Sequence, residues 1–100
     1  MSTKRLELSP HAREKMRDRG ASEDEVLTAI RLGSREPARK GRTMFRKHFA
    51  YNGTWRGRCY AVKQVAPVVR EEEDKFVVVT VHVYYLMEVT TVESVHAEGC

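Results

Sequence analysis

The chain has 100 residues, a formal net charge of +4 and a hydrophobic fraction of 41%, which is enough for one domain with a modest core. No uninterrupted apolar run approaches the roughly 18 residues that a membrane-spanning helix needs, and the N-terminal residues contain no apolar signal segment. We therefore expect a cytoplasmic protein that has no membrane among its partners.

Charge is distributed unevenly along the chain. Residues 1–58 contain 15 Lys/Arg and 7 Asp/Glu, whereas residues 59–100 contain 3 Lys/Arg and 7 Asp/Glu. A basic region that also contains aromatic residues suits an anionic polymer, and we expect RNA as the partner. The alternative is a solvated cationic surface that binds nothing.

The stretch from Ser9 to Gly20 predicts a short, polar helix. Ser9 can cap the first turn, Pro10 suits the first helical position, and Gly20 suits the left-handed conformation that often ends a helix. The charged side of this helix either is solvated or holds cations near an anion. Helical spacing places four of its polar residues on one side: His11, Lys15, Asp18 and Arg19.

A second helix follows after a very short connection. Ser22 and Glu25 form an S-x-x-E capping box, and Gly33 ends the helix. Residues 34–41 contain Pro and Gly and predict a loop. This loop is basic and could contact phosphates through Arg35, Arg39 and Lys40.

From residue 42 onward the apolar residues alternate with period two, which predicts strands. Asn52-Gly53 is a strong signal for a two-residue hairpin turn between a strand over 42–51 and a returning strand over 54–65. This register places Lys47 directly opposite Arg58, which is unfavourable in water.

Two explanations of the Lys47–Arg58 pair remain open. A bulge near Gly57 could change the register, or an anion could lie between the strands. Cations interleaved with aromatic rings are typical of single-stranded nucleic-acid sites, although the rings could equally be core residues that the long cations extend past. The interpretation as a nucleic-acid site gives the predicted RNA-binding residues: Arg46, Lys47, Arg56, Arg58 and Tyr60.

Residues 66–75 predict another loop, because they contain Pro67 and the acidic run 71–74. Residues 76–87 then predict the central strand of the sheet. Its odd-numbered residues form an apolar side that we expect to contact the helices. Three polar residues follow one another on the opposite side of the strand: Thr80, His82 and Tyr84.

These elements predict one α+β domain over residues 1–87, with two N-terminal helices packed on a three- to four-stranded antiparallel sheet. Residues 88–100 predict a C-terminal extension with a short strand and a flexible tail. We predict no metal site and no cofactor, because the histidines are scattered and no phosphate-binding glycine loop is present.

The motif H-A-x-x-K-M-x-x-R-G, which starts at His11, and V-V-T-V in the last strand resemble a family of small bacterial domains, domain-of-unknown-function family 4258. The resemblance covers residues 8–84. The chain departs from the family pattern at Lys15, Ala21 and His82, where arginine, an aliphatic residue and an aromatic residue are usual. The matching residues are His11, Ala12, Met16, Arg19, Gly20, Ser22, Val79, Thr80 and Val81.

This family is similar to the barnase/RelE-like group of metal-independent ribonucleases and toxins. The resemblance therefore implies a RelE/barnase-like fold and an endoribonuclease in which the RNA 2′-hydroxyl attacks the adjacent phosphate. Such a reaction needs a general base, a general acid and cations near the phosphorane. We predict His11 as the acid or base, Lys15 and Arg19 as the cations, and Thr80 and His82 as the residues that complete the pocket.

The alternative hypothesis is a non-catalytic module that binds nucleic acid or protein. In that case His11 caps or packs, and Arg19 pairs with a neighbouring carboxylate. The candidate partners are RNA, a cognate inhibitor protein and a second copy of this chain in a homodimer. Salt-dependent RNA binding without cleavage would favour this second hypothesis.

Overall fold

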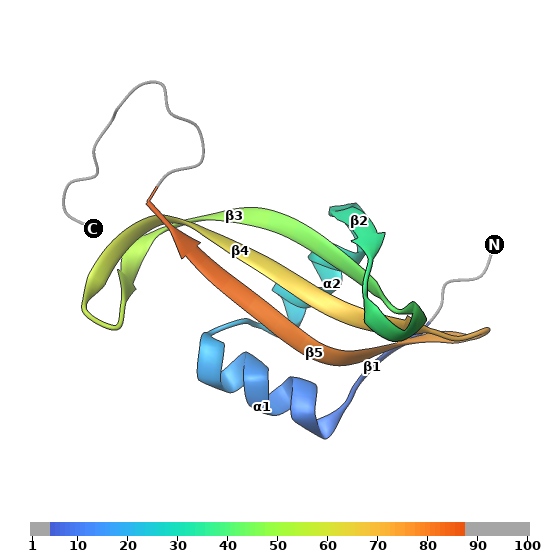
Figure 1. The fold of residues 1–100 in the computed structure, drawn as a ribbon. Coiled ribbons are helices and arrows are strands. Elements are labelled where there is room, and N and C mark those ends of the chain that lie inside the picture. Colours follow the sequence, from blue (N-terminus) through green and yellow to red (C-terminus); the bar gives the residue numbers. More distant parts are fainter. Residues whose placement is uncertain (1–4, 88–100) are drawn as a thin grey trace.

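A computed structural model describes residues 5–87 as an α+β domain (Figure 1). The fold class agrees with the sequence prediction, whereas the predicted C-terminal extension lies outside the described residues. Between residues 5 and 87, no helix is long and apolar enough to span a membrane. The elements are β1 (Arg5–Leu8), α1 (Pro10–Arg19), α2 (Glu23–Leu32), β2 (Ser34–Pro37), the 3₁₀ turn η1 (Arg39–Gly41), β3 (Thr43–Trp55), β4 (Arg58–Glu71) and β5 (Lys75–Leu86).

The sheet has five strands in the order β1-β5-β4-β3-β2 and is mixed. The prediction of three or four antiparallel strands is therefore wrong in two respects. First, β1 pairs with β5 in parallel, with Leu8 beside Val78. Second, residues 34–37 form the edge strand β2 instead of a loop, with Ser34 beside Arg46. All four β2 residues are exposed, so this strand has no hydrophobic alternation by which the sequence could reveal it.

Both helices begin and end where the local sequence indicates. The Ser9 hydroxyl accepts a hydrogen bond from the Ala12 amide at 3.0 Å, and Gly20 ends α1 with a left-handed φ of 80°. Ser22 and Glu25 form the predicted capping box at the start of α2. These caps satisfy backbone groups that have no partner within the helix, so short-range chemistry decides the helix bounds.

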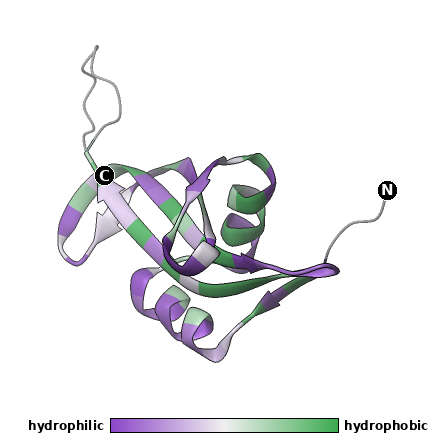
Figure 2. Ribbon diagram, turned by 45° about the vertical axis from the view of Figure 1, so that its right-hand side comes forward, coloured by the Kyte–Doolittle hydropathy of each residue, from purple (hydrophilic) through white to green (hydrophobic). Residues whose placement is uncertain are grey.

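The helices cover different strands of the same sheet, α1 mainly β5 and α2 mainly β4 and β3. Figure 2 shows α1 as a mostly hydrophilic helix, whereas β5 is hydrophobic along much of its length. Only Ala12 and Met16 of α1 are buried, so the packing on β5 holds this polar helix in place. Residues from helices and strands form one core: Leu8, Ala12, Met16, Val26, Ile30, Phe45, Val65, Val69, Val78 and Val81.

The β3–β4 hairpin turns later than predicted. Asn52 and Gly53 lie within β3, where Asn52 has a left-handed φ of 45° and the register shifts between Ala50 and Gly53. The chain reverses at Arg56-Gly57 instead, where φ is 52° and 82°. Two successive positive φ values are what a type I′ hairpin turn requires, so the predicted turn at Asn52-Gly53 is wrong.

The observed register also removes the unfavourable pair that the sequence suggested. Lys47 lies beside Val65, and Arg58 lies beside Trp55. No anion is needed between Lys47 and Arg58. A bulge does change the register, as one alternative held, but it lies within β3 and not near Gly57.

The predicted loop over 66–75 is mostly strand. β4 continues through the buried Pro67, which lies beside Val81 of β5, and only a tight turn separates Glu71 from Lys75. Proline has no amide hydrogen and is rare inside sheets, which is why the sequence predicted a loop here.

A second bulge changes which side of β5 faces the helices. Val68 pairs with Thr80 whereas Val69 pairs with Val78, so Val79 is an extra residue on β5. The prediction that odd-numbered residues face the helices therefore holds only after the bulge. The β5 residues that belong to the core or pack against it are Phe76, Val78, Val81 and Val83.

Candidate nucleic-acid interface

The sheet surface opposite the helices carries a group of mostly polar side chains, which we call the His82 face. Strand registers place these residues beside one another: Met44, Val68 and Thr80 form one line across the sheet, and His48, Gln64 and Tyr84 form another. His82 lies between these lines on β5. The side chains that define the His82 face are Met44, Arg46, His48, Gln64, Val68, Thr80, His82 and Tyr84.

Arg19 reaches His82 around the edge of the sheet. β1 ends at Leu8, so within residues 5–87 no strand pairs with β5 on that side beyond Val78. Arg19 Nη1 donates to the Val81 carbonyl at 2.9 Å and lies 3.4 Å from His82 Nδ1. The half-buried Arg19 thus satisfies an edge carbonyl and places a cation against the imidazole.

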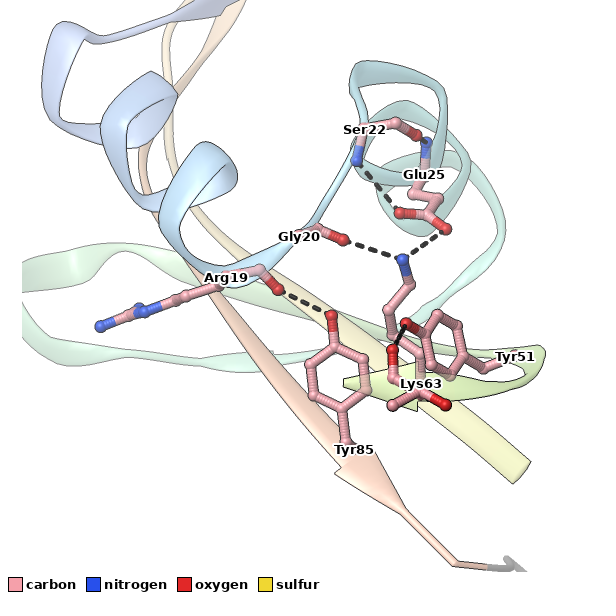
Figure 3. A network of polar contacts seen from close by, with 8 residues as sticks. Arg19, Gly20, Ser22, Glu25, Tyr51, Lys63 and Tyr85 are labelled. Atoms are coloured by element: carbon pink, nitrogen blue, oxygen red, sulfur yellow. Dashed lines mark hydrogen bonds and ion pairs between the residues drawn. The ribbon is translucent and has the colours of Figure 1, made fainter. Parts of the chain in front are cut away.

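The end of α1 is fixed by two side chains from the sheet (Figure 3). The Tyr85 hydroxyl donates to the Arg19 carbonyl at 2.8 Å, and Lys63 Nζ donates to the Gly20 carbonyl at 2.8 Å. Lys63 is only 8% exposed, and Glu25 Oε2 lies 3.0 Å from its ammonium group. We call this group of five residues the helix clamp: Arg19, Gly20, Glu25, Lys63 and Tyr85.

Aromatic rings pack beside the helix clamp. Trp55 stacks on Tyr85 with ring centroids 4.8 Å apart, and Gly20 lies against both rings. Burial is the main cause that raises the pKa of Tyr85 to about 12. Its hydroxyl therefore stays protonated at neutral pH and can donate to the Arg19 carbonyl.

An open cavity of about 640 Å³ lies beside His82, between β5 and the β2–β3 connection. Thr80 and His82 form one side of it, and Arg39 and Arg42 of the connection form another. Arg46 lies close enough for its charge to act on His82. Its guanidinium forms an ion pair with Glu36 Oε2 at 3.2 Å and donates to Gln64 Oε1 at 3.0 Å. The complete lining is Pro37, Ala38, Arg39, Arg42, Met44, Val68, Thr80 and His82.

His82 is an electrically neutral hydrogen-bond donor in this setting. Burial, followed by the charges of Arg19 and Arg46, lowers the pKa of His82 below 6.5. A guanidinium can only donate, so we assign Nδ1 as the acceptor from Arg19 and Nε2 as the nitrogen that carries the hydrogen. The free side of the ring therefore presents an N–H group, which suits an anion or a carbonyl oxygen.

The structure brings together three of the five predicted catalytic residues. Thr80 and His82 line one cavity, and Arg19 contacts His82. Lys15 is half-buried one turn earlier on α1, and His11 is exposed near its start. Eight residues of helix correspond to about 12 Å, so His11 lies well away from Arg19. Within residues 5–87, the His11 side chain has no hydrogen-bond or ion-pair partner.

The predicted RNA-binding residues do not form one surface. Arg46 belongs to the His82 face, whereas Lys47 lies over the Phe49 ring, at 5.7 Å from its centroid. Arg56 and Arg58 lie at the hairpin turn. Arg56 lies over Trp55 at 5.2 Å, and Tyr60 packs against Tyr85 at 5.6 Å.

Several residues of the site were missing from the predicted set. His48 and Gln64 reach the site through strand pairings, and Arg42 reaches it through the backbone turn before β3. No local sequence pattern specifies either arrangement. Arg39 and Tyr84 stand out in the sequence, as part of a basic loop and a polar line, but the sequence does not assign them to the site.

Comparisons with family models, curated proteins and solved structures found no match. Over residues 5–87, no three His, Cys, Asp or Glu side chains are grouped so that they could hold a metal ion.

Proposed function

We propose that this chain is a small cytoplasmic RNA-binding domain that holds a single strand on the His82 face. The observation that supports this most is that Arg19 and Arg46 lie near the His82 imidazole, while Arg39 and Arg42 line the cavity beside it. Arginine forms strong hydrogen bonds with phosphate oxygens. The cations come from α1, the β2–β3 connection and β3, so different elements bring them to His82 and to its cavity.

A single strand fits this surface better than a duplex. Tyr84 is 42% exposed, and its ring is nearly parallel to that of His82, with centroids 6.4 Å apart. Exposed rings beside cations allow unpaired bases to stack while phosphates pair with the cations. In a duplex the base faces are stacked on one another and cannot contact Tyr84.

RNA cleavage is a second candidate function, favoured by the Thr80 hydroxyl and His82 imidazole in a cavity that arginines also line. In this reaction the 2′-hydroxyl loses its proton and its oxygen attacks phosphorus. The bond to the 5′-oxygen breaks and that oxygen takes up a proton, giving a 2′,3′-cyclic phosphate and a 5′-hydroxyl. His82 would replace His11 as the proton-transfer group. His82 Nδ1 can accept the 2′-hydroxyl proton only after Arg19 moves away, so we rank binding above cleavage.

The RelE/barnase-like fold and the toxin-type role that the family resemblance implies belong to this second candidate. They predict cleavage without a metal ion and a cognate inhibitor protein that covers the His82 face. Neither is required for RNA binding.

Fluorescence anisotropy with labelled RNA of mixed sequence tests the proposal. We expect single-stranded RNA to bind more tightly than a duplex of equal length. Arg42→Gln should weaken binding about tenfold, because it removes a charge-assisted hydrogen bond. Arg31→Gln, in the last turn of α2, removes the same charge from the helix side of the sheet and should have little effect. Absence of binding, or equal losses in the two variants, would contradict the proposal.

The same samples, together with His82→Gln, test cleavage when they are incubated with RNA in excess chelator. Cleavage that His82→Gln abolishes and Arg31→Gln retains would establish the second candidate. Intact RNA under conditions that saturate binding would leave the chain a binding module.

A further inference from the structure

The cavity beside His82 combines apolar and cationic surfaces in different parts. Met44 and Val68 form an apolar floor from two neighbouring strands, and Pro37 and Ala38 add an apolar wall. Polar groups converge at the opposite wall, which consists of Thr80 and His82. Sites for small organic molecules have this composition: a mostly apolar interior with a few polar groups that fix the orientation.

The cations of the cavity are held by a closed turn of the backbone. The Arg42 amide donates to the Arg39 carbonyl at 3.2 Å, and the Ala38 amide donates to the Arg42 carbonyl at 2.8 Å. Lys40 and Gly41 complete this turn with φ values of 59° and 72°. The turn thus fixes the backbone from which Arg39 and Arg42 extend toward the same cavity.

Arg39 and Arg42 also differ from Arg46 in their partners. Arg46 is already paired with Glu36. Within the part of the chain that the structure describes, neither Arg39 nor Arg42 has a carboxylate partner. Two such guanidinium groups beside an apolar cavity suit a ligand with a phosphate at one end and an apolar ring system at the other.

We propose that this cavity binds one complete nucleotide of the RNA strand, with the base inside and its phosphate on Arg39 and Arg42. This inference rests on the proposed function and deepens it, because it makes one nucleotide the unit of recognition. The cavity volume of about 640 Å³ lies within the range of about 300–1,000 Å³ that holds small organic ligands.

The groups around the cavity have separate roles toward such a nucleotide. The base rests on Val68 and on the polarizable thioether of Met44, which contacts aromatic rings favourably. The Thr80 hydroxyl and the His82 Nε2–H group hydrogen-bond the base edge. A free phosphate would contact only the two arginines, and a free nucleoside would contact only the interior of the cavity. Only a nucleotide contacts both.

Calorimetric titration of the full chain tests this inference with AMP, GMP, CMP and UMP, and with inorganic phosphate and adenosine for comparison. We expect at least one mononucleotide to bind tenfold or more tightly than phosphate and adenosine do. Mononucleotides that bind no more tightly than inorganic phosphate would overturn the inference.

Two variants and one control locate the binding. Arg42→Gln should weaken mononucleotide binding about tenfold through loss of a charge-assisted hydrogen bond. Ala38→Leu fills part of the cavity from a residue with extended backbone, so it should weaken mononucleotide binding and leave phosphate binding unchanged. Arg31→Gln should change neither. If Ala38→Leu has no effect on mononucleotides, or Arg31→Gln weakens them as much as Arg42→Gln, the base is not in this cavity.

The inference and the proposed function fail in different ways. If single-stranded RNA binds but mononucleotides do not, the nucleotide cavity is refuted and the RNA-binding function stands. If mononucleotides bind but a ten-nucleotide single strand binds no more tightly than they do, the cavity is supported and the extended RNA site is refuted.

Discussion

The helix clamp predicts that its two charged partners respond unequally to mutation. Lys63 is 8% exposed and donates to the Gly20 carbonyl, whereas the Glu25 side chain is 23% exposed. Glu25→Gln retains the capping box, because glutamine can also accept from the Ser22 amide. The substitution therefore leaves Lys63 as a buried cation without its counter-ion and changes little else.

The size of this effect follows from the surroundings of Lys63. Removing one partner of a fully buried ion pair costs about 3–5 kcal/mol. Lys63 keeps the Gly20 carbonyl and the Tyr51 ring, whose centroid is 5.3 Å away, so we expect Glu25→Gln to cost about 2–3 kcal/mol. At about 4–8 °C for each kcal/mol in a domain of this size, Tm should fall by about 8–24 °C.

Lys63→Met should cost less than Glu25→Gln, because it removes the buried charge and leaves a Glu25 carboxylate that water can reach. Apolar replacement of a buried charge is often neutral or stabilising when the volume is similar. The double variant should be more stable than Glu25→Gln alone. Urea and thermal unfolding followed by circular dichroism measure all four proteins of this cycle. Equal costs for the two single variants, or additive costs in the double variant, would refute the reasoning.

Two further predictions concern His82 and the glycines with positive φ. Because the pKa of His82 is lowered in the folded protein, the unfolded chain binds more protons just below pH 6.5, so stability should fall as pH decreases from 7.5 to 5.5. Urea unfolding should show a smaller fall in His82→Gln than in wild type or His48→Gln, and an unchanged fall would contradict the assignment. Gly57→Ala should cost about 1–2 kcal/mol through its φ of 82° alone. Gly20→Ala, at a φ of 80°, also places a Cβ 2.7 Å from Tyr85 Oη and should cost about 1–3 kcal/mol more; equal Tm values would refute this contact.

The sequence revealed the helices because their signals are local. Ser9, Gly20 and the Ser22–Glu25 capping box each act within one turn of backbone. The hairpin register depends on distant contacts instead. Asn52-Gly53 is the stronger local turn signal, but the observed register places Lys63 beside Phe49 and within reach of Glu25. These tertiary contacts outweigh the turn preference, and no local pattern contains them.

The part of the candidate site that lies on a single strand could be predicted from the sequence. The polar line Thr80, His82 and Tyr84 could be seen in one strand, and the bulge of β5 leaves it on one side. Arg19 joins it because α1 packs on β5 and the Arg19 guanidinium reaches the Val81 carbonyl. His11 does not join the site, because it lies near the other end of α1 and therefore far from Arg19. The cavity depends on how the β2–β3 connection lies beside β5, which only the assembled sheet determines.

The salt dependence of RNA binding tests the central claim most directly. Each phosphate that a cation neutralises on a single strand contributes about −0.7 to the slope of log Kobs against log salt. Up to four arginines lie near His82 or line its cavity, so we predict a slope of about −2 to −3 for single-stranded RNA. The slope should become about 0.7 less negative in Arg42→Gln and remain unchanged in Arg31→Gln. A slope near zero, or one that Arg42→Gln does not change, would contradict the claim that RNA phosphates bind at the His82 face.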